Sequence, residues 1–170
     1  MSKRFDGQVA VVTGAGRGIG EAIAKKLADE GAKVAVVSRT EANAGKTAEA
    51  INAAQPGAAR AYAVDVADFS AVQELADVIF RDFGKVDILV NNAGVTRDGL
   101  SMRMSSDDWD LVVDTNLKGA FNFIRAVQRP MVKQRSGRII NISSVSGLTG
   151  NAGQANYAAS KAGLIGLTKT

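Results

Sequence analysis

Short runs rich in β-branched apolar residues alternate along this chain with longer segments of helical spacing, and this alternation constrains the fold most. The runs that we expect to form strands cover residues 8–13, 33–38, 59–64, 86–91 and 138–143. The segments that we expect to form helices cover residues 19–30, 41–54, 70–83, about 107–134, and the stretch around 154–163. Several runs are apolar on both faces, which is typical of parallel strands that helices cover on each side.

The order of these elements predicts an α/β fold. With right-handed crossovers, the alternation gives a doubly wound, Rossmann-type parallel sheet with strand order 3-2-1-4-5. Ligands of such sheets bind at the carboxyl ends of the strands, here where the order reverses between strands 1 and 4. We see no internal repeat or linker, so we expect residues 1–170 to form one domain.

Capping residues mark several of the predicted helix ends. Gly31 and Gly84 follow the first and third helices, and Ser105 precedes the fourth. Glycine is favoured just after a helix and serine just before one. Pro130 lies inside the fourth helix, which we expect it to kink or interrupt.

Composition restricts the chemistry that the chain can perform. Its residues are 46% apolar and 22% charged, as in soluble globular proteins. Because it contains no cysteine and no histidine, it has no thiolate chemistry, and we expect no metal site. Proton transfer must therefore involve tyrosine, lysine, serine or carboxylate groups.

Charge and hydropathy argue against two classes of partner. The net charge of +4 is modest, and Lys and Arg are scattered along the sequence, so we do not expect nucleic-acid binding. The apolar run near the N-terminus is too short for a secretory or membrane-spanning segment. We expect a cytoplasmic protein without a membrane partner.

A glycine-rich turn, TGAGRGIG, follows the first predicted strand and leads into the first helix. Glycines there let the backbone approach a pyrophosphate, and the helix N-terminus offers free N–H groups. We therefore predict that this turn binds a dinucleotide, through Gly14, Gly16, Arg17, Gly18, Ile19 and Gly20. The alternative is that the glycines only let two backbone segments cross.

The end of the second predicted strand indicates which dinucleotide binds. An acidic residue at this point would hold the ribose 2′-hydroxyl of NAD, but the chain has Ser38, Arg39 and Thr40 before Glu41. Ser38 and Arg39, together with Arg17, suit a 2′-phosphate instead. The expected cofactor is therefore NADP(H), unless Arg39 is only a solvated loop cation.

Tyr157 and Lys161 lie four residues apart in a stretch of small residues, QANYAASKAG. That spacing places both side chains on one face of a helix. A free phenol is a poor proton donor at neutral pH, but a positive charge about 4 Å away stabilises its anion by about 4 kcal/mol. Tyr157 is therefore a candidate proton donor and Lys161 its electrostatic partner. A pair on an ordinary helix surface is the alternative.

Taken together, these motifs resemble the short-chain dehydrogenase/reductase family. The glycine turn matches its Thr-Gly-x3-Gly-x-Gly motif, and the sequences NNAG, DTNLKG, NISSVSG and the Tyr-x3-Lys pair follow in the family's order. The resemblance implies that the catalytic residues are Asn116, Ser144, Tyr157 and Lys161. Asn116 would hold a water that connects Lys161 to solvent, and Ser144 would polarise the substrate carbonyl. Ser143, Ser146 and the residues from Thr149 compete locally with Ser144.

Further cofactor contacts are implied by the same resemblance. Asp65 and Val66 would contact the adenine, although Asp65 also suits a turn at the end of a strand. Asn92, Ala93 and Gly94 would lie against the cofactor ribose, which Tyr157 and Lys161 would also contact. The neighbouring Asn91 suits a role inside the sheet.

Within that family, the motifs are closest to bacterial reductases of 3-oxoacyl thioesters carried on acyl carrier protein. The resemblance thus implies NADPH-dependent reduction of an acyl thioester, with Arg135 as a candidate contact for the acidic carrier. It also implies a homo-oligomer built through the fourth helix and the Tyr157 helix. Trp109 and Phe121 are expected in the core or in an interface.

Two alternatives remain open at this stage. One keeps the mechanism but reduces or oxidises a sugar, polyol or other alcohol. The other is a fragment that binds nucleotide without turnover, because relatives continue beyond residue 170 with further strands and a substrate-covering lid. On that account the domain is incomplete, and the fifth strand is an exposed edge that favours association.

Overall fold

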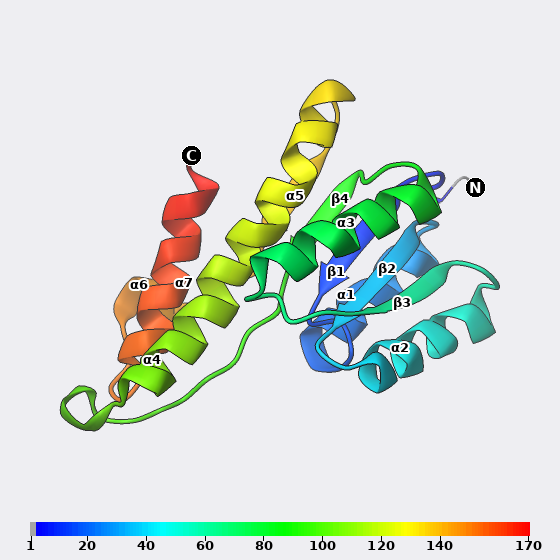
Figure 1. Cartoon of the computed structure of the whole chain (residues 1–170). Coiled ribbons are helices and arrows are strands. Elements are labelled where there is room, and N and C mark those ends of the chain that lie inside the picture. The colour runs from blue at the N-terminus through cyan, green and yellow to red at the C-terminus, as the bar shows by residue number, and fades with distance from the viewer. Residues whose placement is uncertain (1–2) are drawn as a thin grey trace.

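A computed structural model describes residues 3–170 of the chain. Its five strands form a single parallel sheet in the order β3-β2-β1-β4-β5 (Figure 1), as the alternation predicted. The strands are β1 (Val9–Thr13), β2 (Lys33–Ser38), β3 (Ala59–Ala63), β4 (Ile88–Asn91) and β5 (Arg138–Asn141). In the central register, Val11 of β1 lies opposite Ala35 of β2 and Leu89 of β4.

The helices largely follow the predicted segments. They are α1 (Gly18–Asp29), α2 (Glu41–Ala54), α3 (Phe69–Phe83), α4 (Ser106–Val113), α5 (Gly119–Lys133), α6 (Ser146–Thr149) and α7 (Ala155–Thr168). Two further turns are the 3-10 helix η1 (Ser101–Arg103) and the π-helix η2 (Asp114–Lys118). The short α6, η1 and η2 were not predicted.

Helices cover both faces of the sheet, because β1 and β2 carry apolar side chains on both sides. On one face α1 and α2 pack against the sheet through small side chains such as Ala24 and Ala48. On the other face α3 and α5 pack through larger ones, among them Ile79 and Phe123. The alanines let α1 and α2 lie close to the strands, and the whole sheet centre is buried.

Two of the predicted caps have the expected geometry. The Ser105 side chain accepts a hydrogen bond from the Asp108 N–H at the start of α4. Gly84 ends α3 with φ +79°, in the left-handed conformation that glycine adopts without a steric cost. Local chemistry therefore sets these helix ends.

The predicted interruption of the fourth helix at Pro130 is wrong. Helix α5 continues through Pro130 to Lys133, and the irregular turn is η2, between α4 and α5. Pro130 lies in the last turn of α5, so the helix continues for only three residues beyond the position where proline cannot donate a hydrogen bond. The π-helix instead places Asn116 in the middle of the long helical segment, and π-turns of this kind often occur at functional sites.

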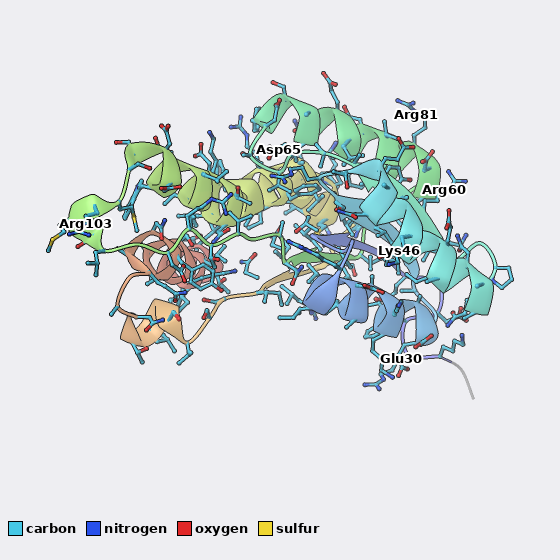
Figure 2. The ribbon with its side chains drawn as sticks, turned by 90° about the horizontal axis from the view of Figure 1, so that it is seen from below. Glu30, Lys46, Arg60, Asp65, Arg81 and Arg103 are labelled. Carbon is cyan, nitrogen blue, oxygen red and sulfur yellow. The ribbon has the colours of Figure 1, made fainter. Side chains whose placement is uncertain are left out.

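Helix α7 lies beside α4, α6 and η2, away from the central strands (Figure 1). Arg103, labelled in Figure 2, marks η1 at the end of the molecule opposite Lys46 and Arg60. Within residues 3–170, no helix is both long and apolar enough to cross a lipid bilayer. In this arrangement, η2 and α7 lie at the end of the sheet where the strands have their carboxyl ends.

Candidate functional site

A cleft of about 560 Å³ opens at the carboxyl ends of the strands, on both sides of the β1–β4 crossing point. Its walls contain every predicted cofactor residue except Tyr157 and Lys161: Gly14, Gly16, Arg17, Gly18, Ile19, Gly20, Ser38, Arg39, Asp65, Val66, Asn92, Ala93 and Gly94. Residues that the sequence did not single out complete it: Thr40, Asn43, Val64, Val95, Leu111 and Thr115. A smaller hollow of about 400 Å³ beside η1 and α4 contains none of the predicted site residues. We call the larger one the β1–β4 cleft.

The glycines of the turn have different physical roles. A Cβ on Gly14 would come within 2.7 Å of the Ala93 Cα, and one on Gly20 would overlap the Gly14 carbonyl. These two positions are glycine because backbone crosses backbone there. Gly18 has φ +59° and open space around its Cβ position, so its backbone faces the β1–β4 cleft without a side chain in the way.

Asn92 fastens the end of β4 to the glycine turn. Its Nδ2 donates to the carbonyl oxygens of Thr13 and Gly14, at 3.0 and 3.2 Å. The Thr13 hydroxyl in turn accepts from the backbone N–H groups of Asn92 and Ala93. These bonds hold two cleft walls in register. Asn91, one residue earlier, donates to Asn141 of β5 at 2.8 Å, a role inside the sheet.

The cationic end of the cleft is formed by the turn after β1 and the end of β2. Arg17 and Arg39 are both exposed and both line the cleft. A Cβ on Gly16 would lie 2.8 Å from the Ser38 Oγ and 2.7 Å from the Asn43 Cβ. The absence of a side chain at Gly16 therefore leaves Ser38 and Asn43 in place beside the two arginines.

The segment after β3 forms another wall of the β1–β4 cleft and is held in a tight turn. Asp65, labelled in Figure 2, accepts a hydrogen bond from the Ala67 N–H on its carboxylate. Its backbone carbonyl accepts one from Asp68, which is the N-cap of α3. Asp65 thus has the turn role that the sequence left open, and it also lines the cleft.

Tyr157 and Lys161 face the same side of α7, as their spacing predicted. The Lys161 Nζ lies 5.7 Å from the centroid of the Tyr157 ring, and it donates to the Ile142 carbonyl at 2.7 Å. Lys161 is only 4% exposed. Burial lowers the pKa of Lys161 below its usual value, because removal from water disfavours the charged form.

The β1–β4 cleft reaches this pair at Gly94. A Cβ at that position would lie 3.7 Å from the Lys161 Nζ and 3.3 Å from the Asn116 Oδ1. Gly94 therefore leaves the approach to the ammonium open. Among residues 3–170, Lys161 forms no salt bridge and the Tyr157 hydroxyl makes no hydrogen bond, so both groups have bonding capacity left.

Asn116 is 1% exposed, and its side chain joins η2 to two other segments. It donates to the Val95 carbonyl at 3.0 Å and to the Ser160 hydroxyl at 3.1 Å, and accepts from the Val95 N–H at 2.8 Å. Both amide hydrogens are therefore in use. A water held by Asn116, as the resemblance implied, must contact Oδ1 or the backbone carbonyl instead.

The two neighbouring serines after β5 differ in their bonding. Ser143 donates its hydroxyl hydrogen to the Lys161 carbonyl at 2.8 Å, a bond that joins β5 to α7. The half-buried Ser144 accepts from the Ser146 N–H at 3.2 Å, and its own hydrogen has no acceptor within residues 3–170. Ser144 thus keeps a donor for a ligand, whereas Ser143 does not.

Comparison with known proteins shows the family of the chain. The short chain dehydrogenase family matches residues 8–170. The chain belongs to that family. It is 49% identical to the 3-oxoacyl-(acyl-carrier-protein) reductase FabG of Salmonella typhimurium, over 98% of this chain and 66% of that protein. It is 50% identical to the 3-oxoacyl-(acyl-carrier-protein) reductase of Synechocystis, over 96% of this chain and 66% of that protein.

Solved structures of the short-chain dehydrogenase fold lead to the same conclusion. An NAD+-bound xylitol dehydrogenase superimposes with a TM-score of 0.94 at 39% identity, over 98% of this chain and 64% of that one. A short-chain alcohol dehydrogenase from Sinorhizobium meliloti, described as putative, gives 0.93 at 39% identity, over 99% and 66%. The chain thus spans about two thirds of the length of these relatives.

Two buried asparagines near the site were missed in the sequence analysis. Asn156, next to Tyr157, is fully buried and donates to the carbonyls of Arg97 and Asp108. Asn122 of α5 holds the segment after β3. No motif marks either residue. The one signal is an asparagine at a position where the helical spacing predicts an apolar side chain.

Proposed function

We propose that this chain is the cofactor-binding and catalytic part of an NADPH-dependent reductase of 3-oxoacyl thioesters. The observation that carries the proposal is the buried Lys161 ammonium beside Tyr157, at the point where the β1–β4 cleft reaches α7. A phenol beside a buried cation is suited to protonate an oxygen that becomes negative during reduction.

The residues of the cleft fit a nicotinamide dinucleotide. Gly18 offers an open backbone at the N-terminus of α1, which suits a pyrophosphate. Lys161 is buried, and within residues 3–170 its one acceptor is the Ile142 carbonyl, so two of its hydrogens remain for the ribose hydroxyls. Arg17 and Arg39 suit a 2′-phosphate, and the end of β2 offers no carboxylate for a ribose 2′-hydroxyl, so NADP(H) is favoured over NAD.

The catalytic residues then act in a definite order. A reduced nicotinamide held in the β1–β4 cleft would supply the hydride for the carbonyl carbon of the substrate. Ser144 donates its free hydrogen to the carbonyl oxygen, polarises the bond and fixes the oxygen near the phenol. Tyr157 transfers its proton to that oxygen, and the Lys161 charge stabilises the phenolate that results. Asn116 holds η2 and the segment after β4 in place.

The substrate class is supported by relatives at 46–51% identity whose names specify 3-oxoacyl-acyl-carrier-protein reduction. A carrier protein is acidic, and the exposed Arg135 at the end of α5 is a candidate contact. Trp109 and Phe121, expected in the core or in an interface, are 41% and 44% exposed. The core interpretation is therefore wrong, and these residues support a homo-oligomer through α4 and α5.

A second candidate function is oxidation of a polyol, favoured by the structural similarity to xylitol dehydrogenase. One experiment distinguishes the candidates: NADPH with acetoacetyl-CoA and NAD+ with xylitol are each mixed with the protein, and the absorbance of reduced nicotinamide is followed. The reductase proposal predicts rapid loss of NADPH with the thioester and no reaction with xylitol. The reverse pattern supports the polyol enzyme. Binding of NADPH without turnover of either substrate contradicts both and leaves a nucleotide-binding fragment.

A further inference from the structure

Helix α5 holds the segment after β3 through one face. Asn122, which is 2% exposed, donates to the carbonyls of Val66 and Ala67 at 2.9 and 3.3 Å. Three residues earlier, a Cβ on Gly119 would come within 2.5 Å of the Val66 side chain. The helix therefore approaches Val66 closely and bonds to its backbone at the same place.

The next turn of α5 extends this contact. The guanidinium carbon of Arg125 lies 4.7 Å from the centre of the Phe69 ring, at the start of α3. Positions 119, 122 and 125 are three residues apart, so they lie along one face of the helix. Together they fix residues 65–69, and Asp65 and Val66 from this segment line the β1–β4 cleft.

Asn122 is a polar side chain in a buried position, so exposure to solvent does not explain why this residue is an asparagine. A buried amide is costly unless its hydrogens find acceptors, and here they find two consecutive carbonyls of a segment that has left β3. An apolar residue would fill this buried position of α5 equally well. The amide is needed only because the carbonyls of Val66 and Ala67 face the helix instead of a strand.

We propose that Asn122 is a positioning residue for the adenine end of the dinucleotide. It acts through Val66 and Asp65, which it holds at the cleft wall, and does not touch the cofactor itself. The inference rests on the proposed function, because it assumes that a dinucleotide occupies the β1–β4 cleft with its adenine against this segment.

The test measures the two halves of the cofactor separately. Asn122→Asp keeps the shape of the side chain but replaces the NH2 group, which carries both donor hydrogens, by one oxygen that faces two carbonyls. We expect it to weaken binding of NADPH and of 2′,5′-ADP by about tenfold, as loss of roughly one hydrogen bond's free energy implies. Binding of reduced nicotinamide mononucleotide, which lacks the adenine, should stay unchanged. Should N122D not fold, Asn122→Ser removes the amide without adding charge, and the same titrations apply.

Asn52 provides a matched control for general loss of stability. The Asn52 side chain of α2 also bonds to backbone: it donates to the Ala59 carbonyl and accepts from the Ala59 N–H, both at 2.9 Å. Asn52 does not line the β1–β4 cleft. Asn52→Asp should lower the midpoint of thermal unfolding without changing either affinity.

Each result decides a different point. Two results overturn the positioning role while the proposed function stands, provided that the wild-type chain binds 2′,5′-ADP. In one, N122D binds 2′,5′-ADP as well as the wild type does. In the other, N122D loses affinity for 2′,5′-ADP and for reduced nicotinamide mononucleotide by the same factor. If the wild-type chain binds neither NADPH nor 2′,5′-ADP, the proposed function fails and the inference fails with it.

Discussion

The Lys161 ammonium lies 5.7 Å from the centre of the Tyr157 ring and is held by the Ile142 carbonyl at 2.7 Å, not by a carboxylate. A carboxylate would cancel most of the field of the ammonium, whereas a carbonyl leaves its full charge. The bond joins α7 to the segment after β5, and the Ser143 hydroxyl adds a second one to the Lys161 carbonyl. The fold thus fixes a bare positive charge beside the phenol.

The first prediction concerns the proton donor. Tyr157→Phe should lower kcat for acetoacetyl-CoA reduction by about 10²–10⁴-fold, the usual contribution of general acid catalysis. The NADPH affinity should stay close to that of the wild type, because the ring and Lys161 remain. Steady-state rates and an NADPH titration measure the two quantities.

The other tyrosine of the chain provides a matched control for this substitution. Tyr62 of β3 donates to Asp82 at 2.6 Å, away from the β1–β4 cleft. Tyr62→Phe removes the same hydroxyl group from a different place and should leave kcat unchanged. Turnover that survives in Y157F but not in Y62F would remove Tyr157 from the proposed role.

The second prediction follows from the buried ammonium. Because burial lowers the pKa of Lys161 in the folded protein, the unfolded chain binds more protons between that lowered pKa and the ordinary value of 10.5. The free energy of unfolding therefore rises with pH across this window, and falls as pH decreases through the lowered pKa. Urea unfolding at a series of alkaline pH values measures the slope.

Removing the charge should abolish that contribution. Lys161→Met should flatten the slope, because the methionine side chain has no proton to bind. Lys169→Met, at the exposed end of the same helix, should keep the wild-type slope. An unchanged slope in K161M would show that Lys161 is solvated in the folded protein.

Sequence reasoning located most of the cleft because the relevant signals are local. A glycine turn between a strand and a helix, and the residues that end β2 and β4, depend on neighbours in the chain. Strand order likewise follows from the alternation of elements. The candidate roles of Asn116 and Ser144 came from the resemblance and not from local signals, and Asn116 bonds to Ser160 of α7.

The missed features depend on contacts between distant segments. Asn122 matters because the carbonyls of Val66 and Ala67 lie against it, and no pattern around residue 122 indicates that. The η2 turn and the continuity of α5 through Pro130 depend on where the helix meets its neighbours. The sequence analysis expected a kink or break at Pro130 because proline disfavours a helix interior. The sequence does not show that Pro130 lies in the last turn of α5.

The third prediction concerns cofactor choice. Arg39→Asp should weaken NADPH binding by about 10–100-fold, because it removes a charge-assisted contact worth about 1.5–3 kcal/mol. The same change should strengthen NADH binding, because a carboxylate at the end of β2 can accept from the ribose 2′-hydroxyl. Titrations with both cofactors test the pair of effects.

Lys46 of α2 is the control for the general positive field. It is exposed and does not line the β1–β4 cleft (Figure 2). Lys46→Ala should therefore change both affinities little. A loss of NADPH and NADH affinity by the same factor in R39D would mean that Arg39 does not read the 2′-phosphate.

The fourth prediction concerns Arg135, the one non-glycine residue with positive φ (+52°) among residues 3–170. The left-handed conformation costs a residue with a Cβ about 1–2 kcal/mol. The neighbouring Gln134 holds the turn by donating to the carbonyls of Val86 and Ser136, so the strain cannot relax. Arg135→Gly removes this cost, but its greater freedom in the unfolded chain offsets about 0.4–1 kcal/mol of the gain.

The difference between two variants isolates the strain. Arg135→Ala loses the same guanidinium but keeps the Cβ, so it stays strained. R135G should be more stable than R135A by about 0.5–1 kcal/mol in urea unfolding at neutral pH. Equal stabilities would show that the turn after α5 relaxes in solution. The left-handed conformation of Arg135 would then cost the folded protein no free energy. A conformational cost that persists at an exposed arginine is expected where its charge is used, as in the proposed contact with an acidic carrier protein.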